Sequence, residues 1–410
     1  MPPLHTRTTV CHHHLRRCSY RQHHIRTFIN ARIKWVRDRH LDAAVEKEKN
    51  LKPLLSLKYL ILSHPTQTLP IATISPLKPD LHLPTSAAKF IQKYPMIFKT
   101  FLPPQTRSAL PHVKLTPRAL AVNREETSAL AISHYRKNAA QRLAKLLMLA
   151  RAGKFPLHLI EMFKYDLGLP HDYLQTLTLE FPDYFQICDT GFSDSKGDVV
   201  FGLELVSWPY DLAVSEMQRR QAEDGKAGMQ IKYSMNFPKG FDLEKKVLEW
   251  VHEWQKLPYI SPYEDASHLL PSGDLAEKWT VGLIHEVLSL FVSKKTERDN
   301  LFCLADFLGF GRVRLKKALV HFPGIFYVSN KLSTQTVVLR EAYSKNLLIE
   351  KHPLMVIRDK HVSLMNLVLR RGKPIGVVFR ERRKGSAGFV ERGKKKVDYN
   401  RWVRSDNDED

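Results

Sequence analysis

Two His-Glu pairs are the part of this sequence that comes closest to a catalytic metal site. His252-Glu253 and His285-Glu286 each begin an H-E-x-x-H motif, in which two imidazoles one helical turn apart bind zinc. The position of the second imidazole holds Lys256 in one motif and Ser289 in the other. Because the second ligand is missing from both motifs, a zinc protease of this type is excluded.

Other catalytic motifs are also missing from the sequence. It contains no G-x-x-x-x-G-K-[ST] phosphate loop and no G-x-S-x-G nucleophile elbow. Acids such as Glu297, Asp299 and Asp306 could serve a metal-dependent nuclease, but their positions fit helix caps and a solvated face. The sequence therefore predicts a protein that is not an enzyme and has no catalytic residues and no cofactor.

The cysteines indicate a reducing compartment. Four of them are too few and too scattered for a disulfide framework, and they form no C-x-x-C pair: Cys11, Cys18, Cys188 and Cys303. The run His12 to His14 between the first two could bind a metal, but it lies in a segment that we expect to be cleaved. We therefore predict no metal site.

Charge identifies the class of partner. The 410 residues carry 64 Lys and Arg against 42 Asp and Glu, which gives a net charge of +22. Such an excess indicates a polyanionic partner or an acidic surface. No stretch approaches the roughly 18 consecutive apolar residues of a membrane span, so membrane insertion is not expected.

Both ends of the chain are basic. The Arg-rich start has no acid before Asp38, which is typical of an organelle transit peptide, and we assign residues 1–33 to it. Arg dominates over Ser, so we predict the mitochondrion, with the chloroplast as the alternative; a basic RNA-binding arm that is retained is another interpretation. Residues 370–410 are predicted to be a disordered basic tail with an acidic end, rich in Lys, Arg and Gly.

A five-residue pattern occurs three times: aromatic, Pro, any residue, apolar, Phe. The copies are 94–98, 181–185 and 322–326. Pro cannot continue a helix and pushes the preceding residue out of the helical region, so each copy predicts a junction from helix to strand. We interpret Pro182 and Pro323 as structural rather than RNA-contacting residues.

The flanking sequence repeats as well. In the third copy, periodicity predicts helices at 278–292, 297–308 and 312–322 and strands at 326–329 and 336–339. In the second copy it predicts helices at 139–151, 157–167 and 171–181 and strands at 184–189 and 199–206. The first copy is looser, with helices at 51–63 and 85–94 and a returning strand at 113–115.

Three helices followed by a two-stranded hairpin are typical of the winged helix-turn-helix. We therefore expect an α+β fold that is predominantly helical, with about three winged-helix-like units near 51–120, 139–213 and 275–340. Helical linkers join them. One linker helix, predicted at 241–256, places Val247, Trp250, Val251 and Trp254 on a single face, which favours a core position.

Ordered sequence blocks between residues 34 and 366 resemble the plant organelle RNA recognition (PORR) domain. They are KWVRDR at 34–39, LTP at 115–117, LAKLLM at 143–148, DLGLP at 166–170, LELVSW at 203–208, LPYISPYE at 257–264, HEVLSL at 285–290 and FPGIFY at 322–327. The resemblance implies a plant protein, imported into an organelle, that binds RNA and assists the splicing of group II introns. It supplies no catalytic residues that could be transferred to this chain.

The basic helices of the repeats are the candidate RNA-binding elements. The third helix of the third copy carries Arg312, Arg314, Lys316 and Lys317, and that of the first copy carries Lys89 and Lys93, whereas that of the second copy has no Lys or Arg. Arg142 and Lys145, on the first helix of the second copy, complete the set. In the third copy we expect Leu315, Leu319 and Phe322 to face the core and Arg312 and Lys316 to face outward.

The predicted partner is organellar intron-containing RNA, bound together with other splicing factors in a ribonucleoprotein complex. Basic and aromatic surfaces would hold the intron, and the RNA would supply the chemistry. The alternative is a structural or assembly protein of the organellar ribosome. RNAs that co-purify with the protein distinguish the two.

Overall fold

The computed structural model describes residues 35–103, 110–150, 152–193, 197–226, 228–237, 241, 244–271, 273–370 and 373–375. The predicted transit peptide and, from residue 376 onward, the predicted basic tail lie outside the described residues. Helices dominate the described part, and its sheets are small and antiparallel. The predicted fold class is confirmed.

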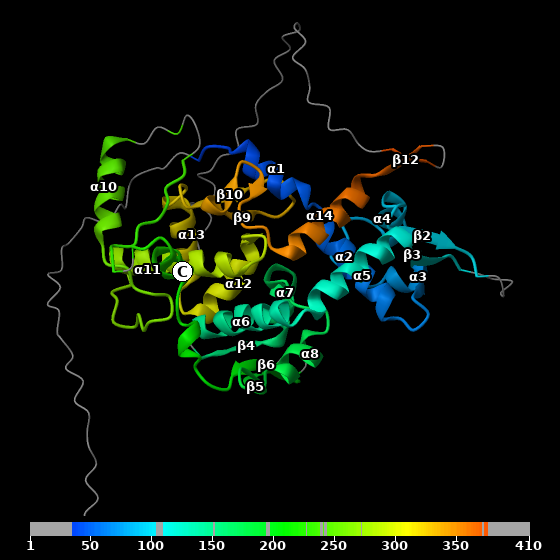
Figure 1. Cartoon of the computed structure of the whole chain (residues 1–410), viewed down its shortest axis with the longest axis horizontal. Coiled ribbons are helices and arrows are strands. Elements are labelled where there is room, and N and C mark those ends of the chain that lie inside the picture. The colour runs from blue at the N-terminus through cyan, green and yellow to red at the C-terminus, as the bar shows by residue number, and fades with distance from the viewer. Residues whose placement is uncertain are drawn as a thin grey trace, which may run out of the picture.

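Three units repeat one order of elements: helix, strand, helix, helix, strand, strand (Figure 1). The first unit consists of α2 (Leu51–Ser63), β1 (Thr68–Pro70), α3 (Ile71–Ile74), α4 (Ala87–Lys93), β2 (Phe98–Phe101) and β3 (His112–Leu115). The second consists of α6 (Ser133–Leu149), β4 (Lys154–Pro156), α7 (Leu157–Leu167), α8 (Tyr173–Glu180), β5 (Phe185–Ser193) and β6 (Val199–Leu205). The third consists of α11 (Asp274–Leu290), β7 (Lys295–Glu297), α12 (Arg298–Leu308), α13 (Arg312–His321), β8 (Phe326–Ser329) and β9 (Thr336–Leu339).

Each unit closes its hairpin with an additional strand. The strand orders are β1-β3-β2, β4-β6-β5 and β7-β9-β8, so the strand after the first helix always pairs with the last strand. This completes the winged-helix topology. Sequence reasoning missed these strands because three residues are too few to show an alternating pattern, and only pairing with a distant strand defines them.

The Pro motif ends the third helix in all three units. Tyr94, Phe181 and Phe322, which precede the prolines, share one backbone conformation, with φ between −121° and −117° and ψ between 57° and 62°. This conformation lies outside the helical region, as expected for a residue before Pro. The helix-to-strand junction predicted from the sequence is confirmed.

Most element boundaries agree with the sequence pattern, and two helices are longer than expected. α6 begins at Ser133, ahead of the expected start of the second unit at 139, and α11 begins at Asp274. The extra residues of α6, 133–138, are mostly polar, so the hydrophobic periodicity does not reach them. The linker helix α10 (Lys245–Lys256) begins later than the predicted 241. It buries Val247, Trp250 and Trp254 and half-buries Val251 against the core, which confirms the predicted core position of this face.

The remaining elements connect or cover the units. They are the helices α1 (Arg39–Lys47), α5 (Pro117–Ala131), α9 (Glu216–Glu223) and α14 (Pro353–Asn366), the 3-10 turns at Tyr210–Leu212 and Arg340–Ala342, and two short strand pairs, β10 (Tyr343–Ser344) with β11 (Leu347–Leu348) and β12 (Val368–Arg370) with β13 (Lys373–Ile375). α1 lies on the sheet of the third unit, where Asp42 accepts hydrogen bonds from Tyr327 (2.9 Å) and Ser329 (2.7 Å).

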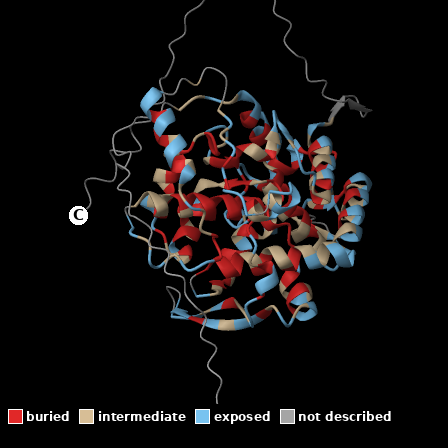
Figure 2. Cartoon of the chain, turned by 60° about the vertical axis from the view of Figure 1, so that its left-hand side comes forward, coloured by how far each residue is buried: buried red, intermediate tan, exposed pale blue. Residues whose placement is uncertain are grey.

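The second and third units share one hydrophobic core, whereas the first unit has its own. Phe163 of α7 stacks on Phe291 at a centroid distance of 5.5 Å, and Thr296 donates to the buried Asp166 carboxylate at 2.6 Å. The buried residues gather in the middle of the molecule (Figure 2). α5 and α14 pack against each other and attach the first unit to this body.

Candidate nucleic-acid interface

The third helix of the third unit, α13, has the two faces that the sequence predicts. Leu315, Leu319 and Phe322 are between 1% and 5% exposed, so they lie in the core. Arg312 is exposed and Lys316 is half-buried. The helix therefore packs through one side and presents cations on the other.

Arg312 and Lys317 of α13 each have an acidic neighbour. Arg312 lies 3.3 Å from Asp306, both side chains being more than half exposed, and Lys317 lies 3.6 Å from Glu277. An exposed pair of this kind contributes little to stability, because water screens it, so Arg312 can exchange Asp306 for a phosphate at low cost. Arg314 forms no ion pair with any described residue.

The corresponding helix of the first unit, α4, is also basic on its outer side. Lys89 and Lys93 lie one helical turn apart and are exposed. Neither forms an ion pair within the described part of the chain, and the Lys93 ammonium lies 5.4 Å from the centre of the Tyr94 ring. In the second unit, by contrast, Glu180 at the end of α8 pairs with Arg136 of α6.

Arg142 and Lys145, on α6, are used inside the protein. Arg142 Nε donates to the Leu167 carbonyl at 2.9 Å, and burial, with the nearby Arg358, lowers the pKa of Arg142 to about 10. Lys145 Nζ donates to the Val214 carbonyl at 2.7 Å. These contacts hold α6 against its neighbours, so we do not include the two residues in an RNA-binding surface.

The structure does not bring the predicted cations into one patch. α4 lies at the right-hand side of the molecule in Figure 1, whereas α13 lies on the left. The charge of the units differs as well: residues 51–120 hold nine basic residues and one acid, 139–213 hold six and ten, and 275–340 hold ten and five. A polyanion is therefore attracted to the first and third units rather than to the second.

Sequence reasoning missed the cations on the hairpin of the first unit. Lys99 of β2 and Lys114 of β3 are both exposed and are direct partners in the register of the two strands. A signal was present in β3, because His112–Leu115 alternates between polar and apolar residues as a half-buried strand does, whereas Phe98–Phe101 does not alternate.

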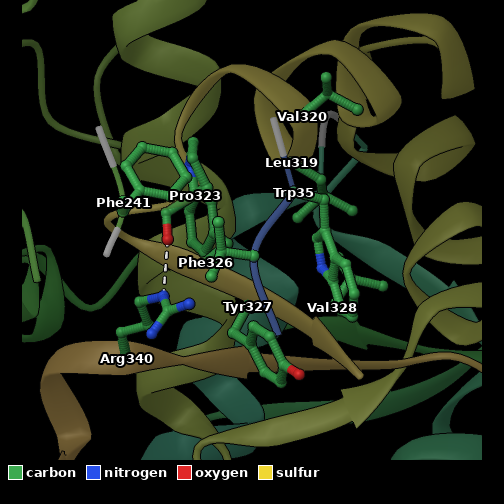
Figure 3. A pocket seen from close by; sticks show the side chains of 10 residues that line it. Trp35, Phe241, Leu319, Val320, Pro323, Phe326, Tyr327, Val328 and Arg340 are labelled. Carbon is green, nitrogen blue, oxygen red and sulfur yellow. Dashed lines mark hydrogen bonds between the residues drawn. The ribbon is translucent and has the colours of Figure 1, made fainter. Parts of the chain in front are cut away.

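A small pocket beside α13 is apolar (Figure 3). Its lining includes Trp35, Phe241, Leu319 and Pro323. The Arg340 side chain at its edge donates to the Pro323 carbonyl at 2.6 Å and to Asp38 at 2.8 Å. Because the Arg340 guanidinium is already paired, the pocket fits a role in packing better than a role in ligand binding.

The two His-Glu pairs sit in different surroundings. His285 lies 2.7 Å from Glu341, while the buried Glu286 accepts hydrogen bonds from the Tyr263 hydroxyl and the Glu216 amide, each at 2.7 Å. His252 and Glu253 lie on α10, where Glu253 pairs with Lys256 at 2.7 Å. Among the described residues, no group of three or more His, Cys, Asp or Glu side chains is placed to hold a metal ion, and no helix is long and apolar enough to cross a membrane.

Comparison with known proteins gives a match over nearly the whole chain. The family model described as "Plant organelle RNA recognition domain" matches residues 36–370. The chain is 35% identical to Protein WHAT'S THIS FACTOR 9, mitochondrial, of Arabidopsis thaliana, over 90% of this chain and 92% of that protein.

More distant relatives span most of the chain too. The identity is 29% to the Protein WHAT'S THIS FACTOR 1 homolog, chloroplastic, of Oryza sativa subsp. japonica, over 88% of this chain and 72% of the relative. The identity is 30% to Protein ROOT PRIMORDIUM DEFECTIVE 1 of Arabidopsis thaliana, over 82% of this chain and 84% of that protein. No solved structure matches the chain.

Proposed function

The chain belongs to the plant organelle RNA recognition family, and on that basis, together with its basic helix faces, we propose that it binds intron-containing RNA in a plant organelle and assists group II intron splicing. The cations of α4 and α13, of which Lys89, Lys93 and Arg312 are exposed, carry this proposal. They occupy the third helix of two winged-helix units, while the same helix of the remaining unit lacks Lys and Arg. In winged helices this element meets nucleic acid.

The protein acts without catalysis of its own. Splicing requires the intron to hold a particular fold, and a basic protein stabilises such a fold by neutralising phosphates that would otherwise repel one another. The intron RNA and its bound Mg²⁺ supply the chemistry. In keeping with this role, Glu286 serves internal hydrogen bonds that join α9, α11 and the 257–264 segment.

The organelle is the mitochondrion. The Arg-rich first 33 residues support this assignment, and so does the mitochondrial relative at 35% identity. The chloroplast is the alternative, because chloroplastic relatives are similar over almost as much of the chain.

Co-purification of RNA with the tagged protein from separated mitochondria and chloroplasts tests the proposal. We expect intron-containing precursors to be enriched from mitochondria, and those introns to be retained in plants that lack the protein. Enrichment of ribosomal RNA with normal splicing would identify a ribosomal assembly protein instead. Recovery of intron RNA from chloroplasts would correct the organelle and leave the activity unchanged.

A further inference from the structure

The outer side of the first unit's sheet carries cations that belong to neither α4 nor α13. Side chains alternate along a strand, so Phe98, Val113 and Leu115 point into the core and are at most 4% exposed. The opposite side consists of Thr68, Pro70, Lys99, Phe101, His112 and Lys114, which we call the first-unit sheet face. All six are exposed or half-buried.

Two like charges lie directly across from each other on this face. Lys99 of β2 pairs in register with Lys114 of β3, and neither ammonium has a hydrogen bond or ion pair with the described residues. Like charges at directly opposed positions destabilise an antiparallel pair. An anion bound between the two ammonium groups would remove this repulsion and thereby stabilise the sheet.

An aromatic side chain lies next to the two cations. The Lys114 ammonium is 4.9 Å from the centre of the Phe101 ring, and the Phe101 and His112 ring centres are 5.8 Å apart. His112 Nδ1 lies 2.8 Å from the Leu110 carbonyl, which orients the imidazole. Cations beside ring side chains suit single-stranded RNA, whose phosphates and unstacked bases are available together.

The same two positions in the second unit hold no cation. Gln186 and Glu204 replace Lys99 and Lys114 in the register, and the Gln186 amide donates to the Glu204 carboxylate at 2.5 Å. Lys154 of β4 lies on the other side of Glu204 in the same sheet. This sheet presents no unbalanced positive charge at these positions.

In the third unit these positions are covered. Tyr327 and Val338 occupy them, and both are buried beneath α1 by contact with Leu41 and Val45. Of the three winged-helix sheets described, only that of the first unit has an open and cationic outer side. Figure 1 shows β2 and β3 at the right-hand end of the molecule, away from the other two sheets.

We propose that the first-unit sheet face binds single-stranded RNA, with phosphates at Lys99 and Lys114 and a base or ribose against Phe101 and His112. This inference rests on the proposed function, and it names the surface that takes up unpaired segments of the RNA. Its surroundings favour an anion, because Asp80 is the one acid between residues 51 and 120.

The test introduces the second unit's own pair into the first unit. In the full chain, the double variant Lys99→Gln, Lys114→Glu removes the repulsion and supplies a partner for each side chain, so we expect the urea midpoint to stay the same or rise. Affinity for a single-stranded oligonucleotide should fall about tenfold or more at about 0.1 M salt, and the log-log salt slope should shrink by about 1.4, at roughly 0.7 per phosphate contact.

Two further variants isolate the site. Lys245→Gln, Lys246→Glu makes the same charge change at exposed positions of α10 and should leave both affinity and slope near wild type. Phe101→Leu keeps all charges, so it should weaken binding severalfold without changing the slope. Double-stranded RNA should compete poorly for this face, since its bases are not accessible to the Phe101 ring.

The outcomes separate this inference from the proposed function. If the wild-type chain binds no RNA, the proposed function itself fails. If the wild type binds RNA but the Lys99, Lys114 variant retains its affinity and slope, the first-unit sheet face does not bind RNA. The basic faces of α4 and α13 are then the RNA-binding surfaces. Equal losses in the α10 control would show nonspecific attraction, and equally tight binding of duplex RNA would overturn the single-strand assignment.

Discussion

Lys58 of α2 and Glu126 of α5 form a buried ion pair between the first unit and the linker helix that follows it. Lys58 is fully buried and Glu126 is 8% exposed. The Tyr59 hydroxyl also donates to Glu126 at 2.5 Å, and the His361 imidazole of α14 lies 3.5 Å away. Three helices therefore meet at one carboxylate. We expect the ionisation of this carboxylate to determine how strongly the first unit is held to α5 and α14.

We predict that acid weakens the contact of the first unit with α5 and α14, because this contact depends on the ionised Glu126. Burial favours the neutral form of Glu126, but His361, Lys58 and Tyr59 outweigh it and lower the pKa from 4.5 to about 2. A carboxylate with a depressed folded-state pKa stabilises the protein above its unfolded pKa, and the contribution is lost as the pH falls toward the folded value. We expect a loss on the order of 3 kcal/mol from this group as the pH falls from about 4.5 to about 2.

Urea unfolding as a function of pH measures this effect. The Glu126→Gln variant should be about 3–5 kcal/mol less stable at neutral pH, because Lys58 is left buried without its partner, and its acid-dependent loss should be smaller. Glu125→Gln removes the neighbouring exposed carboxylate and is the matched control, expected to behave as the wild type. Identical pH profiles for the Glu126→Gln variant and the wild type would contradict the assignment.

The α13 cations predict a salt-dependent loss of RNA binding. Replacing Arg312 and Lys316 with Ala should leave the fold intact, since the apolar face of the helix is unchanged, and should reduce the log-log salt slope for single-stranded RNA by about 1.4. Fluorescence anisotropy titrations at several salt concentrations provide the slope. Asp172→Ala with Gln175→Ala, at the N-cap and in the first turn of the equivalent helix α8, should have little effect. Equal losses from both helices would rule out a special role for α13.

The Pro323 junction predicts an effect on stability alone. Pro323→Ala gives the unfolded chain more freedom and should cost about 0.5–1 kcal/mol, while RNA affinity of the folded protein stays at the wild-type level. Arg340→Met removes the side chain that donates to the Pro323 carbonyl and to Asp38, so it should lower the free energy of unfolding by more than Pro323→Ala does. Thermal unfolding and RNA binding of both variants decide the matter. Lost binding at an unchanged melting temperature would reverse the assignment.

The tail predicts a general contribution to RNA affinity. Truncation after Ile375 keeps the β12–β13 pair and removes most of the basic residues that follow residue 370. Affinity for unrelated RNAs should fall together, with a smaller salt slope and an unchanged unfolding curve, because counterion release does not depend on sequence. A truncated protein with the wild-type slope would show that the tail does not contact RNA.

Much of the local structure could be predicted from the sequence because its signals are local. Proline after an aromatic residue ends each third helix, and hydrophobic periodicity located Leu51–Ser63, Leu157–Leu167, Phe326–Ser329 and Thr336–Leu339 with their observed ends. The family, the basic character of α4 and α13 and the buried side of α13 also follow from residue types and their spacing.

Tertiary structure decided which charges are available. Residue type and spacing alone indicate that Arg142 and Lys145 are surface cations, yet packing of α6 against α7 and the 210–214 segment turns them inward to main-chain carbonyls. Conversely, Lys99 and Lys114 are separated along the chain, and only the pairing of β2 with β3 makes them neighbours. The physical reason is the same in both cases: the exposure and the neighbours of a charge depend on contacts between distant segments, which residue types and their spacing do not specify.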